Sequence, residues 1–358
     1  MPKLRPIAFV LPQFHPIPEN DKWWGKGFTE WTNVKKAKPL FKGHYQPHVP
    51  ADLGYYDLRE PEARLAQAQL AQKYGIHGFC YYHYWFNGKR LLNYPIDEIL
   101  RLQEPNMPFM LCWANENWTR RWDGLDQDIL IEQNYNFEDD KNHMRWLCSN
   151  VFKDKRYIRV DNKPVFVVYR HQLFPDISKT AKIWRDIAVN EFGYDGLYLC
   201  ITESFNDRSN PESINFDAAV EFSPHQVIRN HLTPSISQRI LSRLGFTKHK
   251  DLDKRDFKTG VEESLKRRMP KYKLFRCVTP SWDNTARKKE NGVIAIGSNP
   301  KLYYKWLNRL VKAFKPYSRD ENFIFINALN EWAEGNHLEP CKKYGTAYFE
   351  ATKKALDS

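Results

Sequence analysis

The sequence lacks any apolar stretch near the roughly 20 residues that a membrane-spanning helix needs. Its N-terminus leads only into a short apolar run that ends at Pro12. The composition is that of a globular protein, because 42% of the 358 residues are hydrophobic and 27% are charged. We therefore expect a folded chain without a signal peptide or a membrane span, located in the cytoplasm.

Motifs for metals, disulfides and nucleotides are missing as well. The six cysteines are far apart and include no C-x-x-C pair, so neither a zinc site nor a disulfide framework is indicated. Cys80 and Cys112 lie inside apolar runs, where a free thiol behaves as a small hydrophobic side chain. The sequence also has no P-loop and no dinucleotide-binding glycine fingerprint. We expect chemistry that needs no metal and no cofactor.

Short β-like runs alternate with longer segments of helical pattern, which is typical of repeated βα units around a parallel sheet. Strands covered on both faces are almost continuously apolar, and most of the runs fit this description. Strands are predicted at 7–11, 78–84, 109–113, 165–169, 197–201, 218–222, 275–279 and 323–328. Helices are predicted at 60–74, 94–103, 139–150, 178–192 and 302–314. The pattern predicts an α/β protein, a (β/α)₈ or TIM barrel in a single domain covering 1–358.

Positive charge is concentrated in one segment. Residues 229–276 contain 14 Lys or Arg and 5 Asp or Glu, which is nine of the twelve net positive charges. We interpret 229–274 as a basic insertion between strands six and seven. Near-helical spacing with one cationic face comes from Ile236, Arg239, Ile240, Leu241, Arg243 and Leu244. Contact with an anionic membrane or a phosphorylated substrate and a plain solvated helix remain alternatives. Such local charge does not favour nucleic acid as a partner.

Polar and aromatic residues gather where the predicted strands end, and this is the edge at which barrel enzymes place their active sites. Aromatic residues make up 15% of the chain, and their rings can stack on the C–H faces of sugars or pack in the core. The residues expected to bind substrate are Gln13, His15, Glu30, Trp31, Tyr82, His83, Trp85, Trp113, Asn115, Glu116, Tyr169, Glu203, Glu221, Trp282, Asp283, Asn330, Trp332 and Glu339.

Structural roles are open alternatives for several of these residues. His15 and His83 are explained equally well as core histidines. Glu30 and Trp31 lie in a loop rich in Trp, Gly and Lys, which they can simply anchor. Glu339 can support the neighbouring segment instead of contacting substrate.

Two carboxylates follow the last predicted strand, and we expect them to be catalytic. Glu331 and Glu334 are three residues apart, so their side chains project to the same side if the chain turns helically there. Proximity and unequal burial would hold one protonated and the other ionised, as an acid and base pair requires. An exposed helix face gives the same spacing, but the position beside Trp332 and Gly335 after the terminal strand favours catalysis.

The sequence EWAEGNHLEP at 331–340 resembles the E-W-x-E-G-x-x-x-E-P segment of glycoside hydrolase family 99, and resembles WbsX-type glycosyltransferases still more closely. AFVLPQFHP at 8–16, FTEW at 28–31 and WANE at 113–116 are similar to the second group specifically. The resemblance covers nearly the whole chain. One departure is Ala333, where the hydrolases commonly carry a larger polar residue.

This resemblance implies a barrel and retention of anomeric configuration. It implies that Glu331 deprotonates the sugar 2-hydroxyl, which attacks the anomeric carbon to form a 1,2-anhydro intermediate. Glu334 would protonate the leaving oxygen and then activate the acceptor.

The leading hypothesis is a cytoplasmic glycosyltransferase for a surface polysaccharide such as an O-antigen of lipopolysaccharide. Its partners would be an oligosaccharide or an activated sugar, with peripheral contact to an anionic inner membrane face or a lipid-linked acceptor. An endo-acting glycoside hydrolase, similar to an endo-mannosidase, is the alternative enzyme. A carbohydrate-binding protein without activity is the non-enzymatic alternative.

Overall fold

A computed structural model describes residues 4–120, 125–205, 207–225, 227–229, 232 and 252–358. The residues that predict a basic helix, Ile236, Arg239, Ile240, Leu241, Arg243 and Leu244, lie outside these ranges.

Parallel strands form the centre of the molecule. They are β1 (Arg5–Val10), β2 (Gly78–Phe86), β4 (Phe109–Trp113), β8 (Lys163–Val168), β9 (Tyr198–Glu203), β10 (Ala218–Glu221), β12 (Leu274–Phe275), β13 (Cys277–Val278) and β15 (Phe323–Ile326). The order is β12-β10-β9-β8-β4-β2-β1-β15-β13, and each neighbouring pair is parallel. The first four expected runs, and those at 197–201, 218–222 and 323–328, all coincide with strands.

The seventh position closes the barrel. Expected as one strand at 275–279, it is two short pieces separated by Arg276. β12 pairs with β10, while β13 pairs with β15. Because the two pieces join the ends of the sheet, the described residues form an eight-position barrel. The predicted (β/α)₈ fold is thereby confirmed.

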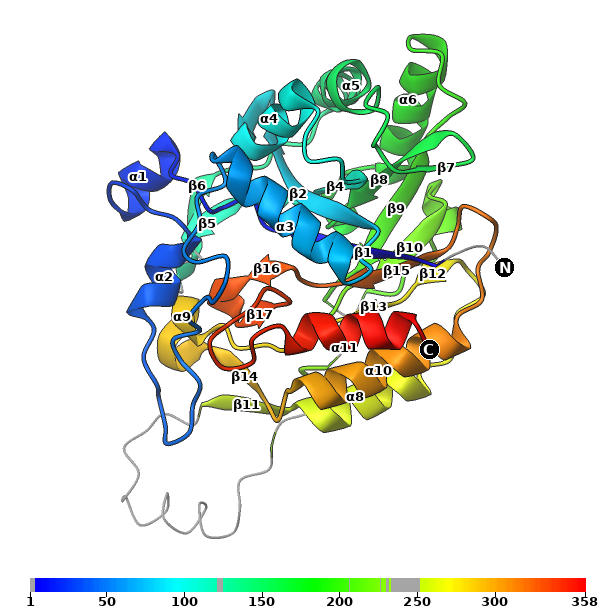
Figure 1. Ribbon diagram of the computed structural model, residues 1–358. Helices are drawn as coiled ribbons and strands as arrows, with labels where there is room; N and C mark the ends of the chain where they lie inside the picture. Colours follow the sequence, from blue (N-terminus) through cyan, green and yellow to red (C-terminus); the bar gives the residue numbers. More distant parts are fainter. Residues whose placement is uncertain (1–3, 121–124, 206, 226, 230–231, 233–251) are drawn as a thin grey trace.

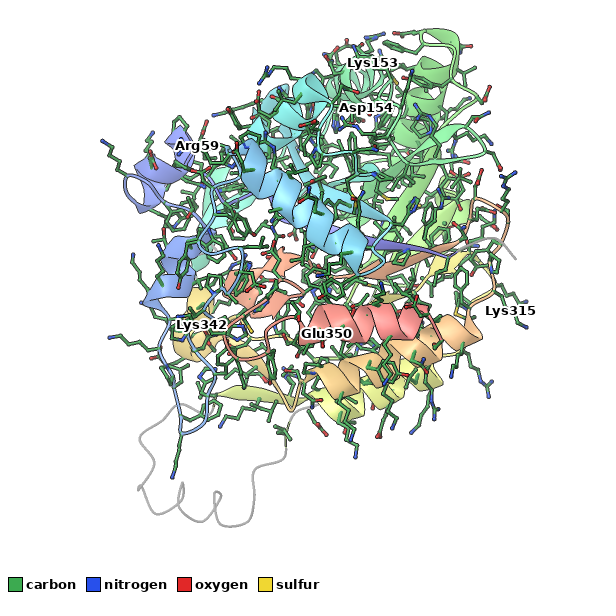
Figure 2. All side chains as sticks on the ribbon, in the orientation of Figure 1. Arg59, Lys153, Asp154, Lys315, Lys342 and Glu350 are labelled. Carbon is green, nitrogen blue, oxygen red and sulfur yellow. The ribbon has the colours of Figure 1, made fainter. Side chains whose placement is uncertain are left out.

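The five predicted helices lie around this barrel as α3 (Pro61–Lys73), α4 (Tyr94–Leu102), α5 (Phe137–Trp146), α6 (Ile177–Asn190) and α10 (Pro300–Ala313). α5 continues into a π-helical turn, η2 (Leu147–Val151). Asn136, Asp176 and Asn299 cap α5, α6 and α10 by accepting backbone N–H groups of the first turn. Trp184 on α6 and Trp306 on α10 are completely buried. Charged residues such as Lys153, Lys315 and Glu350 point outward (Figure 2).

Further helices were not predicted. They are α1 (Pro18–Trp24), α2 (Glu30–Lys36), α8 (Phe257–Lys266), α9 (Thr285–Lys288) and α11 (Ala347–Leu356), with short turns η3 (His171–Leu173), η4 (Pro211–Ile214), η5 (Lys289–Asn291) and η6 (Trp332–Glu334). α8 belongs to the basic segment and packs beside α10, which in turn lies beside α11 (Figure 1). Gly260 permits the close packing of α8, because a Cβ there would lie 2.2 Å from the carbonyl oxygen of Val227.

Small sheets outside the barrel shape its mouth. They pair β5 (Trp118–Arg120) with β6 (Leu125–Ile131), β11 (Asp253–Asp256) with β14 (Val293–Ile296), and β16 (Asn330–Glu331) with β17 (Asn336–His337). β3 (Lys89–Leu91) and β7 (Arg159–Val160) pair with β2 and β8. Across the described part of the chain, no helix has both the length and the apolar character to cross a membrane. All six cysteines are buried and free.

Candidate active site

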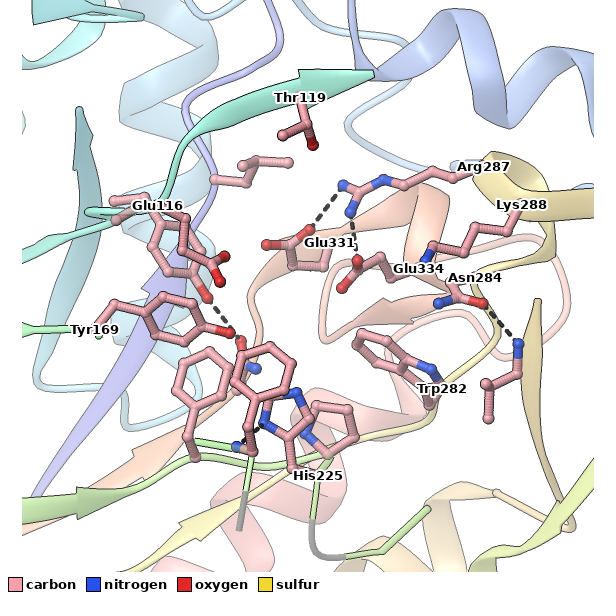
Figure 3. Close-up of a pocket in the computed structure, with 18 of the residues that line it drawn as sticks. Glu116, Thr119, Tyr169, His225, Trp282, Asn284, Arg287, Lys288, Glu331 and Glu334 are labelled. Carbon is pink, nitrogen blue, oxygen red and sulfur yellow. Dashed lines mark hydrogen bonds and ion pairs between the residues drawn. The ribbon is translucent and has the colours of Figure 1, made fainter. Parts of the chain in front are cut away.

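A cavity of about 450 Å³ opens at the carboxyl ends of the strands. Expected residues that line it are Tyr82, Glu116, Tyr169, Trp282, Glu331 and Glu334. Lining residues that the sequence did not single out include Phe205, Phe222, His225, Arg287 and Lys288. Figure 3 shows Glu331 and Glu334 beside Arg287, with Tyr169 and His225 across the cavity. The two predicted carboxylates therefore share one hollow.

The turn that carries the two carboxylates is a single 3-10 turn rather than an α-helix. Glu331 ends β16, and Glu334 ends η6. Gly335 then adopts a φ of 56°, and β17 returns antiparallel to β16. A Cβ on Gly335 would lie 3.0 Å from Cβ of Asp283, so the turn is also packed tightly. Because the turn is so short, the spacing of the two carboxylates is set locally.

One arginine joins the two carboxylates to a third. Arg287 lies on α9, and its Nη2 donates to Oε2 of Glu331 over 3.0 Å and to Oε1 of Glu30 over 2.7 Å. Its Nη1 donates to Oε1 of Glu334. Sequence reasoning missed Arg287. Its position in the segment between strand seven and the next barrel helix was the available signal, since active-site residues follow barrel strands.

Burial sets the electrostatics of this group. It raises the pKa of Glu331 to about 8, with a further contribution from the charge of Glu334 and opposition from Arg287. Burial also raises the pKa of Glu30, against the opposing effect of Arg287. Although burial disfavours its charge, the carboxylates of Glu30, Glu334 and Glu331 hold the pKa of Arg287 above its usual value. Without substrate, Glu331 therefore keeps its proton at neutral pH.

The opposite wall of the cavity is aromatic. The rings of Tyr169 and Phe222 are 4.9 Å apart, and those of Phe205 and His225 are 4.4 Å apart. Arg170 lies over the ring of Phe205 at 4.4 Å and pairs with Glu116 over 2.6 Å. A sugar bound between the walls would meet ring faces on one side and carboxylates on the other, which suits its C–H faces and hydroxyls.

Several residues expected at the mouth instead support the carboxylate turn. Oε2 of Glu339 accepts from Trp332 Nε1 over 2.6 Å and from the Tyr56 hydroxyl over 2.8 Å. Burial raises the pKa of Glu339 to about 7. The side chain of Asn330 bonds both the N–H and the carbonyl of Leu11, at 2.8 and 3.0 Å. These contacts hold the turn against β1.

The N-terminal candidates lie behind the same turn. Glu30 accepts from the backbone N–H of Ala333 over 2.9 Å, and Trp31 donates its Nε1 to the carbonyl of Tyr56. The carbonyl of Gln13 accepts from the N–H of Glu30 over 2.9 Å. These residues are buried and do not line the cavity, and the same holds for His15.

Glu203 and Glu221 end β9 and β10 but point away from the cavity. Both pair with Arg267, at 2.6 and 3.0 Å, and Glu221 also pairs with Arg276 over 2.7 Å. Successive side chains of a strand alternate between its faces, so it is Phe222, the next residue, that lines the cavity.

Four further candidates pack behind the cavity wall. His83 shares a hydrogen bond of 2.9 Å with His143, and Trp85 donates its Nε1 to Asp139. Trp113 donates to the carbonyl of Trp85. Asn115 bonds both backbone groups of Arg170, at 2.7 and 2.8 Å, and so positions that side chain at the rim.

Asp283, the last candidate, lies behind Trp282. Its Oδ2 is 2.6 Å from Nε2 of His44, and its Oδ1 accepts from Thr285. No cluster of three or more His, Cys, Asp or Glu within the described ranges is placed to hold a metal ion.

Comparison with known sequences gives one family. The family model described as glycosyltransferase WbsX matches residues 6–352. Proteins from two strains of Xanthomonas campestris pv. campestris, each called "Uncharacterized protein WxcX", are 43% identical over 353 residues. That alignment covers 98% of this chain and 49% of each relative. The chain thus spans about half the length of the curated relatives it matches.

Solved structures share the fold at low sequence identity. A glycoside hydrolase-like protein superposes with a TM-score of 0.61 at 14% identity, covering 99% of this chain and 94% of its own. The GH99 endo-alpha-mannosidase from Bacteroides thetaiotaomicron in complex with bis-tris-propane gives a TM-score of 0.58 at 15% identity, covering 99% and 96%. Both likenesses show a common barrel.

Proposed function

This chain belongs to the WbsX glycosyltransferase family, and from that premise we propose that it transfers a glycosyl group with Glu331 and Glu334 as its catalytic carboxylates. One observation carries the proposal: both side chains line the same cavity and both are held by Arg287. A pair of carboxyl groups in one site is the equipment that glycosyl transfer with an acid and a base requires.

The roles follow from the chemistry of a retaining reaction without a carboxylate nucleophile. Glu331 takes the proton of the donor sugar's 2-hydroxyl, and the 2-oxygen attacks the anomeric carbon while the bond to the leaving group breaks. Glu334 gives its proton to the leaving oxygen. The acceptor hydroxyl then returns a proton to Glu334 and opens the 1,2-anhydro ring, and the proton on Glu331 goes back to the 2-oxygen. Two inversions give net retention.

The raised pKa of Glu331 bears on its role as the base, because Glu331 must first lose the proton that it keeps at neutral pH. A carboxylate with a pKa of about 8 is a stronger base, once ionised, than one with an ordinary value of 4.5. Glu334 is the more exposed of the two, with 20% of its side chain accessible against 8% for Glu331. It is therefore better placed to meet an incoming acceptor.

The sharpest test pairs a product screen with two substitutions. The protein is incubated with nucleotide-activated and lipid-linked sugars plus oligosaccharide acceptors, and products are followed by mass spectrometry, with NMR reporting the anomeric configuration. Glu331→Gln and Glu334→Gln should each lower turnover by about 10³-fold or more. Glu98→Gln, on α4 where Glu98 pairs with the exposed Arg101 away from the cavity, should not. Full activity in either active-site variant would contradict the proposal.

An endo-acting glycoside hydrolase is the second candidate. The same carboxylate pair serves hydrolysis when water replaces the acceptor sugar, and the barrel resembles that of an endo-alpha-mannosidase. Release of oligosaccharides in water, with no transfer from any activated donor, would favour this candidate. Saccharide binding that leaves every substrate intact would instead favour a binding protein.

For the biological setting we propose the assembly of a surface polysaccharide such as an O-antigen, in the cytoplasm at the inner membrane face. The basic segment 229–276 supports this. Of its net charge of +9, Arg267 and Arg276 are paired with Glu203 and Glu221, and the remaining excess of Lys and Arg favours anionic lipid headgroups or a lipid-linked phosphate. Binding to vesicles that contain anionic lipid, lost in high salt and absent with neutral vesicles, is the expected result. Equal binding to both vesicle types would contradict the membrane part alone.

A further inference from the structure

Glu30 is a third carboxylate beside Arg287, and it does not line the cavity. Its side chain is fully buried, and Oε1 accepts both from Nη2 of Arg287 and from the backbone N–H of Ala333. Ala333 lies between Glu331 and Glu334. A carboxylate from α2, about 300 residues earlier in the chain, thus holds the middle of the catalytic turn.

Three carboxyl groups share the guanidinium of Arg287. Its Nη2 serves both Glu30 and Glu331, while Nη1 serves Glu334. Only 10% of the guanidinium-bearing side chain is accessible, so water screens these charges little. One buried cation cannot balance three ionised carboxylates, and any change in one acid must therefore be felt by the other two.

We propose that Glu30 and Arg287 are a pair of positioning residues, in which Glu30 competes with the two catalytic carboxylates for the guanidinium and so controls how readily Glu331 gives up its proton. The inference rests on the proposed function, because it takes Glu331 as the base. Glu30 acts through Arg287 and through the backbone of the turn, without touching the sugar.

Other charged and titratable groups face Glu331 and stay constant across the comparison. They are Tyr82 and Tyr84 from β2, Glu334 from η6, Lys288 from α9 and Glu116 across the cavity. Burial, followed by the charge of Glu331, raises the pKa of both tyrosines above the ordinary value, so these hydroxyls remain neutral.

The direction of each effect follows from the geometry. Glu30→Gln removes the carboxyl group that competes for Nη2 of Arg287 and leaves Nη2 to Glu331, which favours the ionised form of Glu331. Arg287→Gln removes the cation and favours the protonated form. Charges this close shift a carboxyl pKa by roughly 1–3 units. A residue that merely filled space would give no opposed shifts.

The first experiment is the pH profile of kcat/KM for the wild type, Glu30→Gln, Arg287→Gln and the double variant. The acid limb should move down by about one pH unit in Glu30→Gln and up by about one unit in Arg287→Gln. The double variant, which loses one charge of each sign, should return toward the wild type. Arg287→Lys keeps the charge without the two-pronged geometry, so it should keep the wild-type limb with a lower kcat. Glu98→Gln, which lies on α4 and does not line the cavity, is the control for net charge.

The second experiment needs no substrate. The unfolding free energy of each background is compared with that of the same background carrying Glu331→Gln, as a function of pH. The midpoint of the difference lies halfway between the unfolded-state and the folded-state pKa of Glu331, so it should move in the same direction as the acid limb and by about half as much. If Glu30→Gln does not fold, Glu30→Asp takes its place, because the shorter side chain weakens the contact with Nη2 of Arg287 and should move the midpoint in the same direction.

Shifts in the same direction, or no shift in either variant, would overturn the inference. If the midpoint of the stability difference moves in a protein that transfers and cleaves nothing, the positioning pair stands and the proposed function is contradicted. If the protein is active and the midpoint does not move, the proposed function stands and the positioning pair is contradicted.

Discussion

The backbone N–H of Asp283 donates to the carbonyl oxygen of Glu334 over 2.7 Å. This bond ties the loop after the seventh strand to the catalytic turn. The side chain of Asp283 is held in place by Nε2 of His44 and by Thr285, so a segment near residue 44 also supports the turn. The acid that faces the cavity is therefore positioned by residues that never reach it.

Loss of the Asp283 charge should lower the unfolding free energy of the protein by an amount that depends on pH. Burial raises the pKa of Asp283, but the hydrogen bonds from His44 and Thr285 outweigh it and hold the pKa below the ordinary 3.8. Its stabilising contribution is therefore present above pH 3.8 and is lost as pH falls through the lower folded-state value. Asp283→Asn should cost about 2–4 kcal/mol at pH 6, measured by denaturant unfolding, and less at pH 3. An equal cost at both pH values would contradict this.

Gly335→Ala should damage both the fold of the turn and its activity. The added Cβ meets positive φ strain and also Asp283 Cβ at 3.0 Å. We expect a loss of about 2 kcal/mol in unfolding free energy and at least a tenfold fall in kcat. Gly345→Ala is the matched control, because its φ of 50° is similar and no atom lies within 4 Å of the added Cβ. That variant should lose only the strain energy, about 1 kcal/mol, and keep its kcat.

Glu339 should make the protein less stable in alkaline solution. Its folded-state pKa of about 7 lies above the ordinary 4.5, so its contribution is fully present below pH 4.5 and is lost as pH rises through 7. The difference in unfolding free energy between wild type and Glu339→Gln should therefore shrink by about 3 kcal/mol between pH 4.5 and pH 8. A difference that stays constant would show that Glu339 ionises normally.

Truncating the aromatic wall should weaken sugar binding more than turnover. Phe222→Ala removes a ring that lines the cavity beside Tyr169. KM should rise about tenfold while kcat changes less than threefold, since stacking acts on the ground state and the transition state alike. Phe192→Ala, at a partly exposed position beyond the end of α6, serves as the control and should leave both constants unchanged. A selective loss of kcat in Phe222→Ala would point to a role in the chemistry itself.

The barrel was predictable because its strands are buried on both faces and so appear as apolar runs. The exception was the seventh strand, expected as continuous at 275–279. Arg276 interrupts it, since its side chain pairs with Glu221 on the outer face of the barrel. α8 was missed because its charges placed it in the basic segment, although Phe257 and Val261 bury one side of it.

The carboxylate pair was found because its members are neighbours in sequence. Arg287 was missed because its partners Glu30 and Glu331 lie 257 and 44 residues away along the chain. Local patterns also cannot show which face of a strand end a side chain takes. Glu221 was therefore expected at the mouth, whereas its neighbour Phe222 occupies that position.

Both proposed catalytic acids sit on one short turn, whereas the rings that face them come from separate loops across the mouth. The distance between acid and base is thus independent of how those distant loops are built. Substitutions, insertions or deletions in those loops can reshape the cavity for a different sugar while the two acids keep their spacing. Within this architecture, new specificity can evolve without re-evolving catalysis.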